Sequence, residues 1–168
     1  YHLEKAIYLA TNGRPGPVWL DIPLDVQAAL VDEKRLRGFK PPKKQKSKQL
    51  DKLINKVVAK IMSAKRPVIL AGHGIRLSGA QGGFLALIDK LQIPVLTTFN
   101  GFDLVPSDHP LFIGHPGTIG DRAGNFTLQN ADLLISLGSR NNIRQISYNW
   151  PTMLGRPTKS LWMLIQRN

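Results

Sequence analysis

Residues 67–74 have the sequence PVILAGHG, and the fold class follows from them. Val68 to Ala71 form a continuous apolar run, which is typical of a parallel strand buried on both faces. Gly72 and Gly74 come directly afterwards and predict a tight turn, because glycine adopts backbone angles that other residues avoid. This strand and its turn are therefore expected to begin a β-α-β unit.

Helical and strand patterns alternate on both sides of this turn. Upstream, apolar residues recur every three or four positions from Leu50 to Ile61, which predicts an amphipathic helix that ends before Pro67. The other predicted elements are helices at 78–91 (with Phe84, Leu87, Ile88 and Leu91 inward) and 122–129, strands at 93–98, 131–138 and 160–165, and a long loop at 100–117. Alternation over about 120 residues implies right-handed crossovers, so the fold class is α/β with a parallel sheet.

A separate helix and strand are predicted before residue 33. The helix begins at Tyr1 and ends at Gly13, and the strand covers Val18 to Ile22 until Pro23 removes a ladder donor. One helix and one strand are too little to bury a core, so we expect this piece to dock on a neighbouring chain or to fray.

Much of the formal net charge of +12 lies between these two pieces. Residues 33–52 contain nine lysines or arginines and two acidic residues. The double proline Pro41-Pro42 and the scarcity of apolar residues are typical of a solvated linker, which we place at 33–49. A polyanion-binding arm is the alternative, but we expect no nucleic-acid partner, because Phe39 is the single aromatic residue there.

The composition excludes two further classes of site and protein. The 168 residues contain no cysteine, which excludes disulfides and thiolate metal sites. No run of about 18 apolar residues is present, so we expect no membrane partner. A chain without cysteine is compatible with the cytoplasmic location that we expect.

Residues 13–27, GRPGPVWLDIPLDVQ, resemble a segment of the thiamine-diphosphate-dependent enzymes of the acetolactate synthase group. In that family, a Gly-Arg-x-Gly-Pro-Val-x-x-Asp-Ile-Pro-x-Asp-Val-Gln segment closes the pyrimidine-binding domain. The resemblance implies that residues 1–32 are the end of that domain and that the chain is a piece of a larger enzyme.

The remainder of the chain resembles the central domain of the same family. The likeness depends on the order and spacing of four segments, PVILAGHG at 67–74, IPV at 93–95, DHPL at 108–111 and NADLL at 130–134. It implies a Rossmann-like domain, a parallel sheet with flanking helices, over residues 50–168.

The family likeness also implies a nucleotide-binding rim where the central strands end. In acetolactate synthases the central domain holds FAD, which is structural and not redox-active in the reaction. The residues that match the FAD-contact motifs are Gly72, Gly74, Thr98, Gly101, Gly114, Gly117 and Arg140. Taken by themselves, the glycines are also explained as ordinary tight turns, whereas Arg140 is suited to pair with a diphosphate.

Two of these motifs depart from the family pattern. Met-Leu-Gly-Met-His-Gly becomes Phe-Ile-Gly-His-Pro-Gly at 112–117, and Gly-x-Arg-Phe-Asp-Asp-Arg becomes Gly-Ser-Arg-Asn-Asn-Ile-Arg at 138–144. The changes remove a flexible apolar contact, a donor and two charged acceptors. We therefore expect FAD to bind weakly or not at all.

No catalytic or metal-binding residue is predicted within the chain. The family's catalytic Glu, and the Gly-Asp-Gly motif that binds Mg²⁺ and the thiamine diphosphate, belong to its other two domains. Residues 120–122, Gly-Asp-Arg, lack the second glycine of that motif, so Asp121 is interpreted as the start of a helix. His109 and His115 match no common metal motif, and we expect both to be hydrogen-bonded loop residues.

The resulting hypothesis is a fragment of an enzyme that joins or cleaves 2-oxo acids. The parent would use thiamine diphosphate and Mg²⁺, form a carbanion on the cofactor and act as a homo-oligomer. The fragment itself would be non-catalytic, with a structural or nucleotide-binding role. The alternative is a free-standing nucleotide-binding or interaction module without catalysis.

Overall fold

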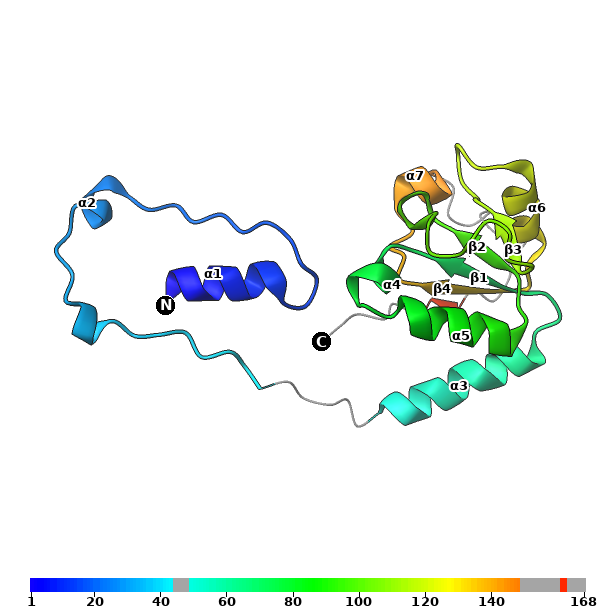
Figure 1. The fold of residues 1–168 in the computed structure, drawn as a ribbon, viewed down its shortest axis with the longest axis horizontal. Helices are drawn as coiled ribbons and strands as arrows, with labels where there is room; N and C mark the ends of the chain where they lie inside the picture. The colour runs from blue at the N-terminus through cyan, green and yellow to red at the C-terminus, as the bar shows by residue number, and fades with distance from the viewer. Residues whose placement is uncertain (44–48, 149–160, 163–168) are drawn as a thin grey trace. The chain divides into compact units, whose positions relative to one another are not determined.

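The computed structural model describes residues 1–43, 49–148 and 161–162. The chain divides into two units, one formed mainly by residues 1–47 and the other by residues 48–165. Figure 1 shows both units, coloured along the chain.

The second unit is built on a parallel sheet with the strand order β3-β2-β1-β4-β5 in the described residues (Figure 1). The strands are β1 (Pro67–Ala71), β2 (Val95–Thr97), β3 (Phe112–Gly114), β4 (Leu133–Leu137) and β5 (Leu161–Trp162). Each neighbouring pair is parallel, which confirms the predicted α/β class.

Strand β1 occupies the centre of the sheet, where its apolar run is shielded on both faces. Val68 to Ala71 are buried, and Ala71 pairs with Thr97 of β2 and with Leu137 of β4. The three central strands therefore end at the same edge. The strand order reverses between β1 and β4, which is where ligands bind in doubly wound sheets.

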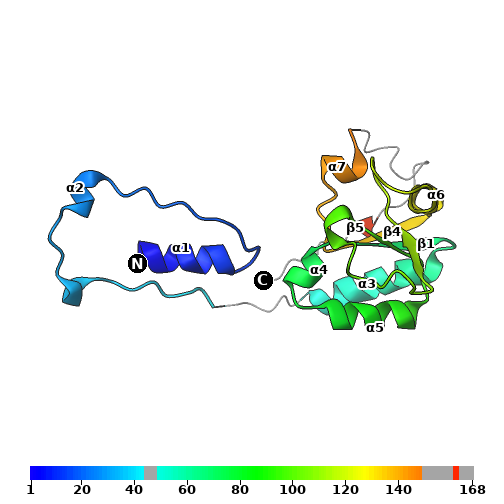
Figure 2. The same ribbon diagram turned by 45° about the horizontal axis from the view of Figure 1, so that its top comes forward.

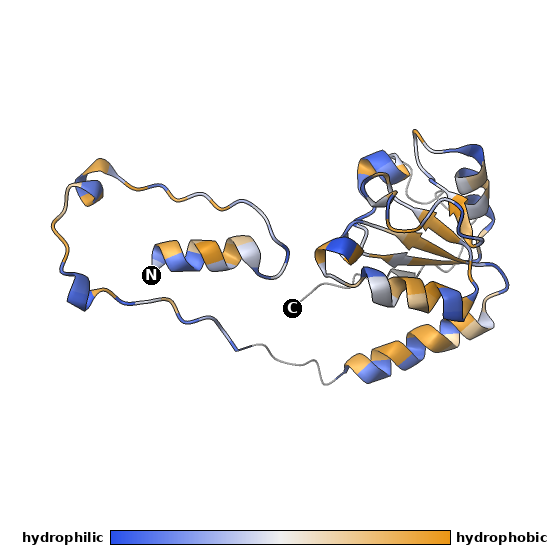
Figure 3. Ribbon diagram, viewed as in Figure 1, coloured by the Kyte–Doolittle hydropathy of each residue, from blue (hydrophilic) through white to orange (hydrophobic). Residues whose placement is uncertain are grey.

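Helices cover both faces of the sheet, as Figure 2 shows from a second angle. Helices α3 (Leu50–Ser63) and α5 (Gln81–Leu91) share an apolar cluster with Ile69 of β1, whereas α6 (Arg122–Asn130) shares one with Leu70. Successive side chains of a strand point to opposite faces, so each layer of helices meets alternate residues of β1. The strands are accordingly coloured as hydrophobic in Figure 3.

The helix predicted at 78–91 begins later than expected. Gly79 has a φ of +69°, so the chain leaves the helical conformation there and separates α4 (Gly74–Leu77) from α5. Phe84 and Ile88 are buried as predicted, but Leu87 is exposed. The prediction for Leu87 was wrong because the sheet meets only a narrow stripe of α5, and Leu87 borders that stripe.

The amphipathic helix predicted from Leu50 is confirmed as α3, but its apolar face is covered only in part. Ile61 packs against the core, whereas Leu50, Leu53, Ile54 and Val58 are exposed. Burial therefore increases toward the C-terminal end of α3, where the helix leads into β1.

The loop predicted at 100–117 contains a further strand, β3, at its end. This strand has three residues and ends in Gly114, so it is too short for periodicity to reveal it. The same holds for α7 (Ile143–Ile146). Of the strand predicted at 160–165, two residues form β5 and the others lie outside the described residues.

The N-terminal unit contains α1 (His2–Thr11), α2 (Leu24–Gln27) and a short 3-10 helix at Glu33–Arg35. The strand predicted at Val18–Ile22 is wrong, since this segment is in no regular structure and Trp19 is 89% exposed. A strand needs a neighbouring strand for its N–H and C=O groups, and no strand in the described residues pairs with this segment. None of the helices in the described ranges is long and apolar enough to cross a membrane.

Candidate functional site

The parallel strands bring four loops to one edge of the sheet, which we call the carboxyl edge. We name them the β1 loop (72–80), the β2 loop (98–105), the β3 loop (115–121) and the β4 loop (138–142). All seven residues predicted to contact a nucleotide lie in these loops or, for Gly114, at the end of β3. The bonds among the loops determine which groups remain free for a ligand.

The β1 and β4 loops touch backbone to backbone at three glycines. A Cβ atom added to Gly72 would lie 2.6 Å from the carbonyl oxygen of Gly138, and one added to Gly74 would lie 2.7 Å from the same oxygen. Gly138 itself has a φ of +63°, and a Cβ atom there would lie 2.5 Å from the nitrogen of Ile75. The packing of the fold alone therefore requires glycine at all three positions.

This contact also uses the N–H groups that a phosphate would need. Gly72 donates to the carbonyl oxygen of Leu137 at 2.8 Å, Gly74 donates to that of Gly138 at 2.9 Å, and Ile75 donates to that of Gly72 at 3.0 Å. In dinucleotide-binding folds, free N–H groups at the first glycine turn hold the pyrophosphate. The turn after β1 keeps none of these three groups free.

Thr98 and Gly101 close the β2 loop over the end of β1. The Thr98 N–H donates to the carbonyl oxygen of Ala71 at 2.9 Å, and the Gly101 N–H donates to that of Thr98 at 2.8 Å. A Cβ atom added to Gly101 would lie 3.0 Å from Cδ1 of Leu104 and 3.1 Å from the Ala71 oxygen. Both predicted site residues are thus buried parts of a tight turn.

Asp121 organises the β3 loop. Its carboxylate accepts hydrogen bonds from the backbone N–H groups of His115 at 2.6 Å and Gly124 at 2.5 Å. Gly114, with a φ of +147°, lies directly against the same carboxylate and leaves no room for a Cβ atom. Asp121 caps α6, which confirms its interpretation as the start of a helix.

Helix α7 holds the β3 loop from the other side. The Gln145 amide donates to the carbonyl oxygen of Pro116, and the Thr118 hydroxyl donates to that of Arg144 at 2.9 Å. Gly117 has a φ of +134°, and a Cβ atom there would lie 3.2 Å from the carbonyl oxygen of Gln145. The predicted site residue Gly117 is therefore enclosed between the β3 loop and α7.

A buried polar network shapes the β4 loop. Asn141 is 1% exposed with a φ of +47°, its Oδ1 accepts from the Ser139 hydroxyl at 2.9 Å, and its Nδ2 donates to Ser136 Oγ at 3.1 Å. Asn142 caps α7 with its side chain. Arg140 is exposed and makes no ion pair within the described residues. Of the predicted site residues, Arg140 is therefore the best placed to meet an anion.

Two histidines are hydrogen-bonded loop residues, as predicted. His109 Nδ1 accepts from the Leu111 N–H at 3.2 Å, which leaves the proton on Nε2, 3.1 Å from Asp89 Oδ1. His115 Nδ1 lies 2.7 Å from Thr97 Oγ1. In the part of the chain that the structure describes, no three His, Asp or Glu side chains are grouped closely enough to hold a metal ion.

Asn141 and Gln145 were missed by sequence reasoning, although both hold the carboxyl edge together. Asparagine tolerates left-handed backbone angles, so an Asn directly after a strand and its glycine turn was a usable signal for Asn141. No local pattern marks Gln145, because its partner Pro116 is distant in the sequence.

The described donor set does not fit a tightly bound FAD or a Mg²⁺-diphosphate group. The N–H groups of Gly72, Gly74 and Ile75 are bonded within the fold, and Arg140 is the one cation among the predicted site residues. A hollow of 190 Å³ beside this edge is lined mainly by apolar groups, among them Ile75, Phe84 and Leu137. Ligand pockets typically measure about 300–1,000 Å³. The hollow is therefore too small for a dinucleotide.

Comparison with known proteins agrees with the motifs. Residues 54–163 match the family described as thiamine pyrophosphate enzyme, central domain. The chain is 40% identical over 146 residues to the acetolactate synthase large subunit of Lactococcus lactis, and 41% identical over 145 residues to the probable acetolactate synthase large subunit of Methanococcus aeolicus. It is 34% identical over 144 residues to the glyoxylate carboligase of Escherichia coli O157:H7.

These alignments include most of the chain but a minor part of each relative. They cover 86%, 82% and 82% of the chain and 25%, 24% and 23% of the three relatives, respectively. The chain thus spans about a quarter of the length of the curated relatives it matches. The matching segment and the parallel α/β sheet lead to one conclusion: the chain belongs to the thiamine pyrophosphate enzyme family, is acetolactate-synthase-like, and contains the central domain of that family.

Proposed function

We propose that the chain is part of a larger thiamine-diphosphate-dependent enzyme that joins or cleaves 2-oxo acids, and that it acts there as a non-catalytic scaffold. The observation that carries this proposal is the alignment with acetolactate synthase large subunits over more than four fifths of the chain. The hydrogen bonds among the loops of the carboxyl edge support a scaffolding role, because they hold these loops in place.

The proposed division is a pyrimidine-domain remnant at 1–32, a linker at 33–49 and the central domain at 50–168. In the parent enzyme, thiamine diphosphate would supply the carbanion chemistry when bound. Mg²⁺, and the diphosphate that it anchors, would be held outside the described residues, which offer no cluster of carboxylates for the metal ion. A cytoplasmic homo-oligomer with small 2-oxo acid substrates follows from the same proposal.

Two assays test the scaffolding role. The purified 168-residue chain, given pyruvate, thiamine diphosphate and Mg²⁺, is expected to show no turnover above background. A chimera in which residues 50–148 replace the aligned segment of the Lactococcus lactis large subunit is expected to fold and to retain cofactor-dependent turnover. Saturable turnover by the chain alone would refute the proposal, as would a folded chimera that binds thiamine diphosphate but is inactive.

A free-standing nucleotide-binding module is the second candidate, favoured by one observation. Arg140 is exposed at the carboxyl edge and has no ion-pair partner among the described residues. The coding sequence on both sides of this segment separates the two candidates. Flanking pyrimidine-binding and diphosphate-binding domains support the scaffold, and a gene without them supports the module.

A further inference from the structure

The β2 loop is attached to the domain at its two ends and reaches into solvent between them. Thr98 at the first end is buried and hydrogen-bonded to β1, and Leu104 at the other end is fully buried. Between them, Phe99 and Phe102 are 79% and 66% exposed. The tip of this loop, residues 99–103, therefore presents two aromatic side chains to solvent at the carboxyl edge.

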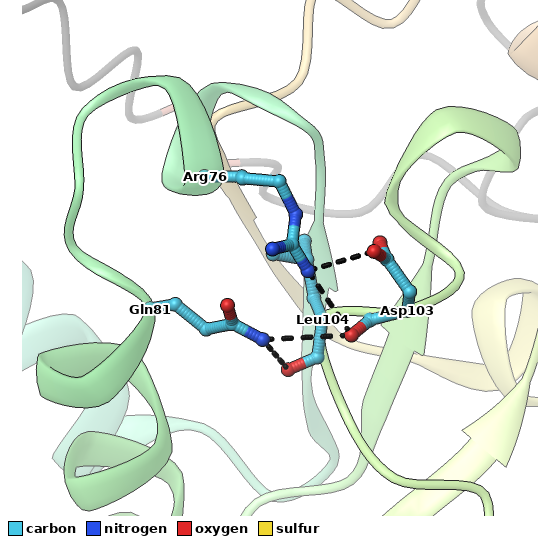
Figure 4. A network of polar contacts seen from close by, with 4 residues as sticks. All are labelled: Arg76, Gln81, Asp103 and Leu104. Atoms are coloured by element: carbon cyan, nitrogen blue, oxygen red, sulfur yellow. Dashed lines mark hydrogen bonds and ion pairs between the residues drawn. The ribbon is translucent and has the colours of Figure 1, made fainter.

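Two side chains that follow β1 hold this tip (Figure 4). Arg76 Nη2 lies 2.7 Å from Asp103 Oδ2 and donates to the Asp103 carbonyl oxygen at 3.3 Å. Gln81, at the start of α5, donates from Nε2 to the carbonyl oxygens of Asp103 at 3.5 Å and Leu104 at 3.3 Å. We name Arg76, Gln81 and Asp103 the latch.

We propose that the latch keeps the tip closed over the carboxyl edge, and that loss of the Arg76–Asp103 ion pair releases residues 99–103. Among the described residues, the latch makes the only side-chain hydrogen bonds to this tip. The other bonds of the tip, from Gly101 to Thr98 and from Leu104 to Gly101, are local turns within the loop. They can move with the loop, so they do not fix its position.

The geometry of the ion pair makes the closed state easy to disturb. The side chains of Arg76 and Asp103 are 38% and 50% exposed, so dissolved salt screens their attraction. The guanidinium contacts Asp103 through Nη2, while its buried Nε has no hydrogen-bond partner in the described structure. A one-sided contact of this kind is weaker than the bidentate fork that arginine forms with a carboxylate. The tip is therefore expected to open locally without unfolding of the sheet.

Opening of the tip would uncover the ends of β1 and β2. In doubly wound sheets, ligands approach the crevice outside these strand ends. The latch would thus control access to the carboxyl edge whichever molecule binds there, and the inference stands independently of the function proposed above.

Limited proteolysis by chymotrypsin measures the opening directly, because the protease needs a locally unfolded segment around Phe99 or Phe102. Cleavage at these sites is expected to be about fivefold faster in Arg76→Met and in Asp103→Asn, which is the effect of losing a partly exposed ion pair. Raising NaCl from about 0.05 M to about 0.5 M should accelerate cleavage of the unmodified chain and leave both variants unchanged.

Arg144→Met is the matched control, because it removes another exposed arginine of this edge that has no ion pair in the described residues. It should leave cleavage at Phe99 and Phe102 unchanged, and cleavage after Trp19 serves as an internal reference. The double variant Arg76→Met/Asp103→Asn should be cut no faster than either single variant. The proposal would be overturned if both single variants were cut at the same rate as the unmodified chain. It would also be overturned if the double variant were cut faster than either single variant, by the product of their separate effects. If circular dichroism shows that Arg76→Met is not folded, Asp103→Asn alone is used for the test.

Discussion

Replacement of Gly138 by alanine is expected to destabilise the domain by about 3 kcal/mol. The backbone at Gly138 has a φ of +63°, and an alanine there costs about 1–2 kcal/mol. The new Cβ atom would also lie 2.5 Å from the Ile75 nitrogen and 2.9 Å from the Gly72 oxygen. Both are backbone atoms that cannot rotate away, so the strain adds about 1–3 kcal/mol, as for overpacked cores.

Gly79→Ala is the matched control, because Gly79 has a φ of +69° but no atom lies within 4 Å of its added Cβ. Gly79→Ala should lower the free energy of unfolding only by the cost of placing alanine at a positive φ, about 1–2 kcal/mol. Gly82→Ala, in α5 and also without close neighbours, should stabilise the domain by about 0.5–1 kcal/mol. Urea unfolding followed by far-ultraviolet circular dichroism measures all three. Equal destabilisation by Gly138→Ala and Gly79→Ala would refute the close contact between the β1 and β4 loops.

Two further predictions concern the start of β1 and the N-terminal unit. Burial raises the pKa of Asp132, but hydrogen bonds from the N–H groups of Lys65 and Arg66, at 2.7 and 2.8 Å, outweigh this and hold the pKa below its ordinary value. Its stabilising effect is therefore complete above pH about 4 and lost as the pH falls through the lowered pKa. In Asp132→Asn, the urea midpoint should therefore depend less on pH below about pH 4 than it does in the unmodified chain. A variant with the same pH dependence as the unmodified chain would contradict the stabilising role of the Asp132 carboxylate. In hydrogen exchange, residues 18–22 should exchange much faster than residues 68–70, and equal protection in a demonstrated monomer would contradict their lack of pairing.

The parallel sheet was predictable because its central strands carry a strong and local signal. Val68 to Ala71 and Leu133 to Leu137 are unbroken or nearly unbroken apolar runs, and the structure buries them on both faces. Val18–Ile22 has a similar composition but is not a strand, since a strand also requires a neighbour to pair with. The composition of a segment does not show whether such a neighbour is present.

The positions of the candidate-site residues were predictable from the sequence, but the contacts that these residues make were not. The sequence shows that Gly72 and Gly74 follow a strand, and this pattern suits a phosphate cradle as well as a tight packing contact. The choice between them depends on Gly138, which is distant in the chain and comes within contact only in the fold. The pairing of Arg76 with Asp103 is hidden for the same reason.

A flavin titration tests most directly whether the carboxyl edge is closed by its own hydrogen bonds. The departures from the family pattern at 112–117 and 138–144 remove contacts to the flavin. Loss of two such contacts, of about 1.5 kcal/mol each, weakens FAD binding by roughly two orders of magnitude. The purified chain, incubated with FAD and then dialysed, is therefore expected to be colourless, with weak or no quenching of flavin fluorescence during the titration. A yellow protein that retains stoichiometric FAD after dialysis would contradict the account.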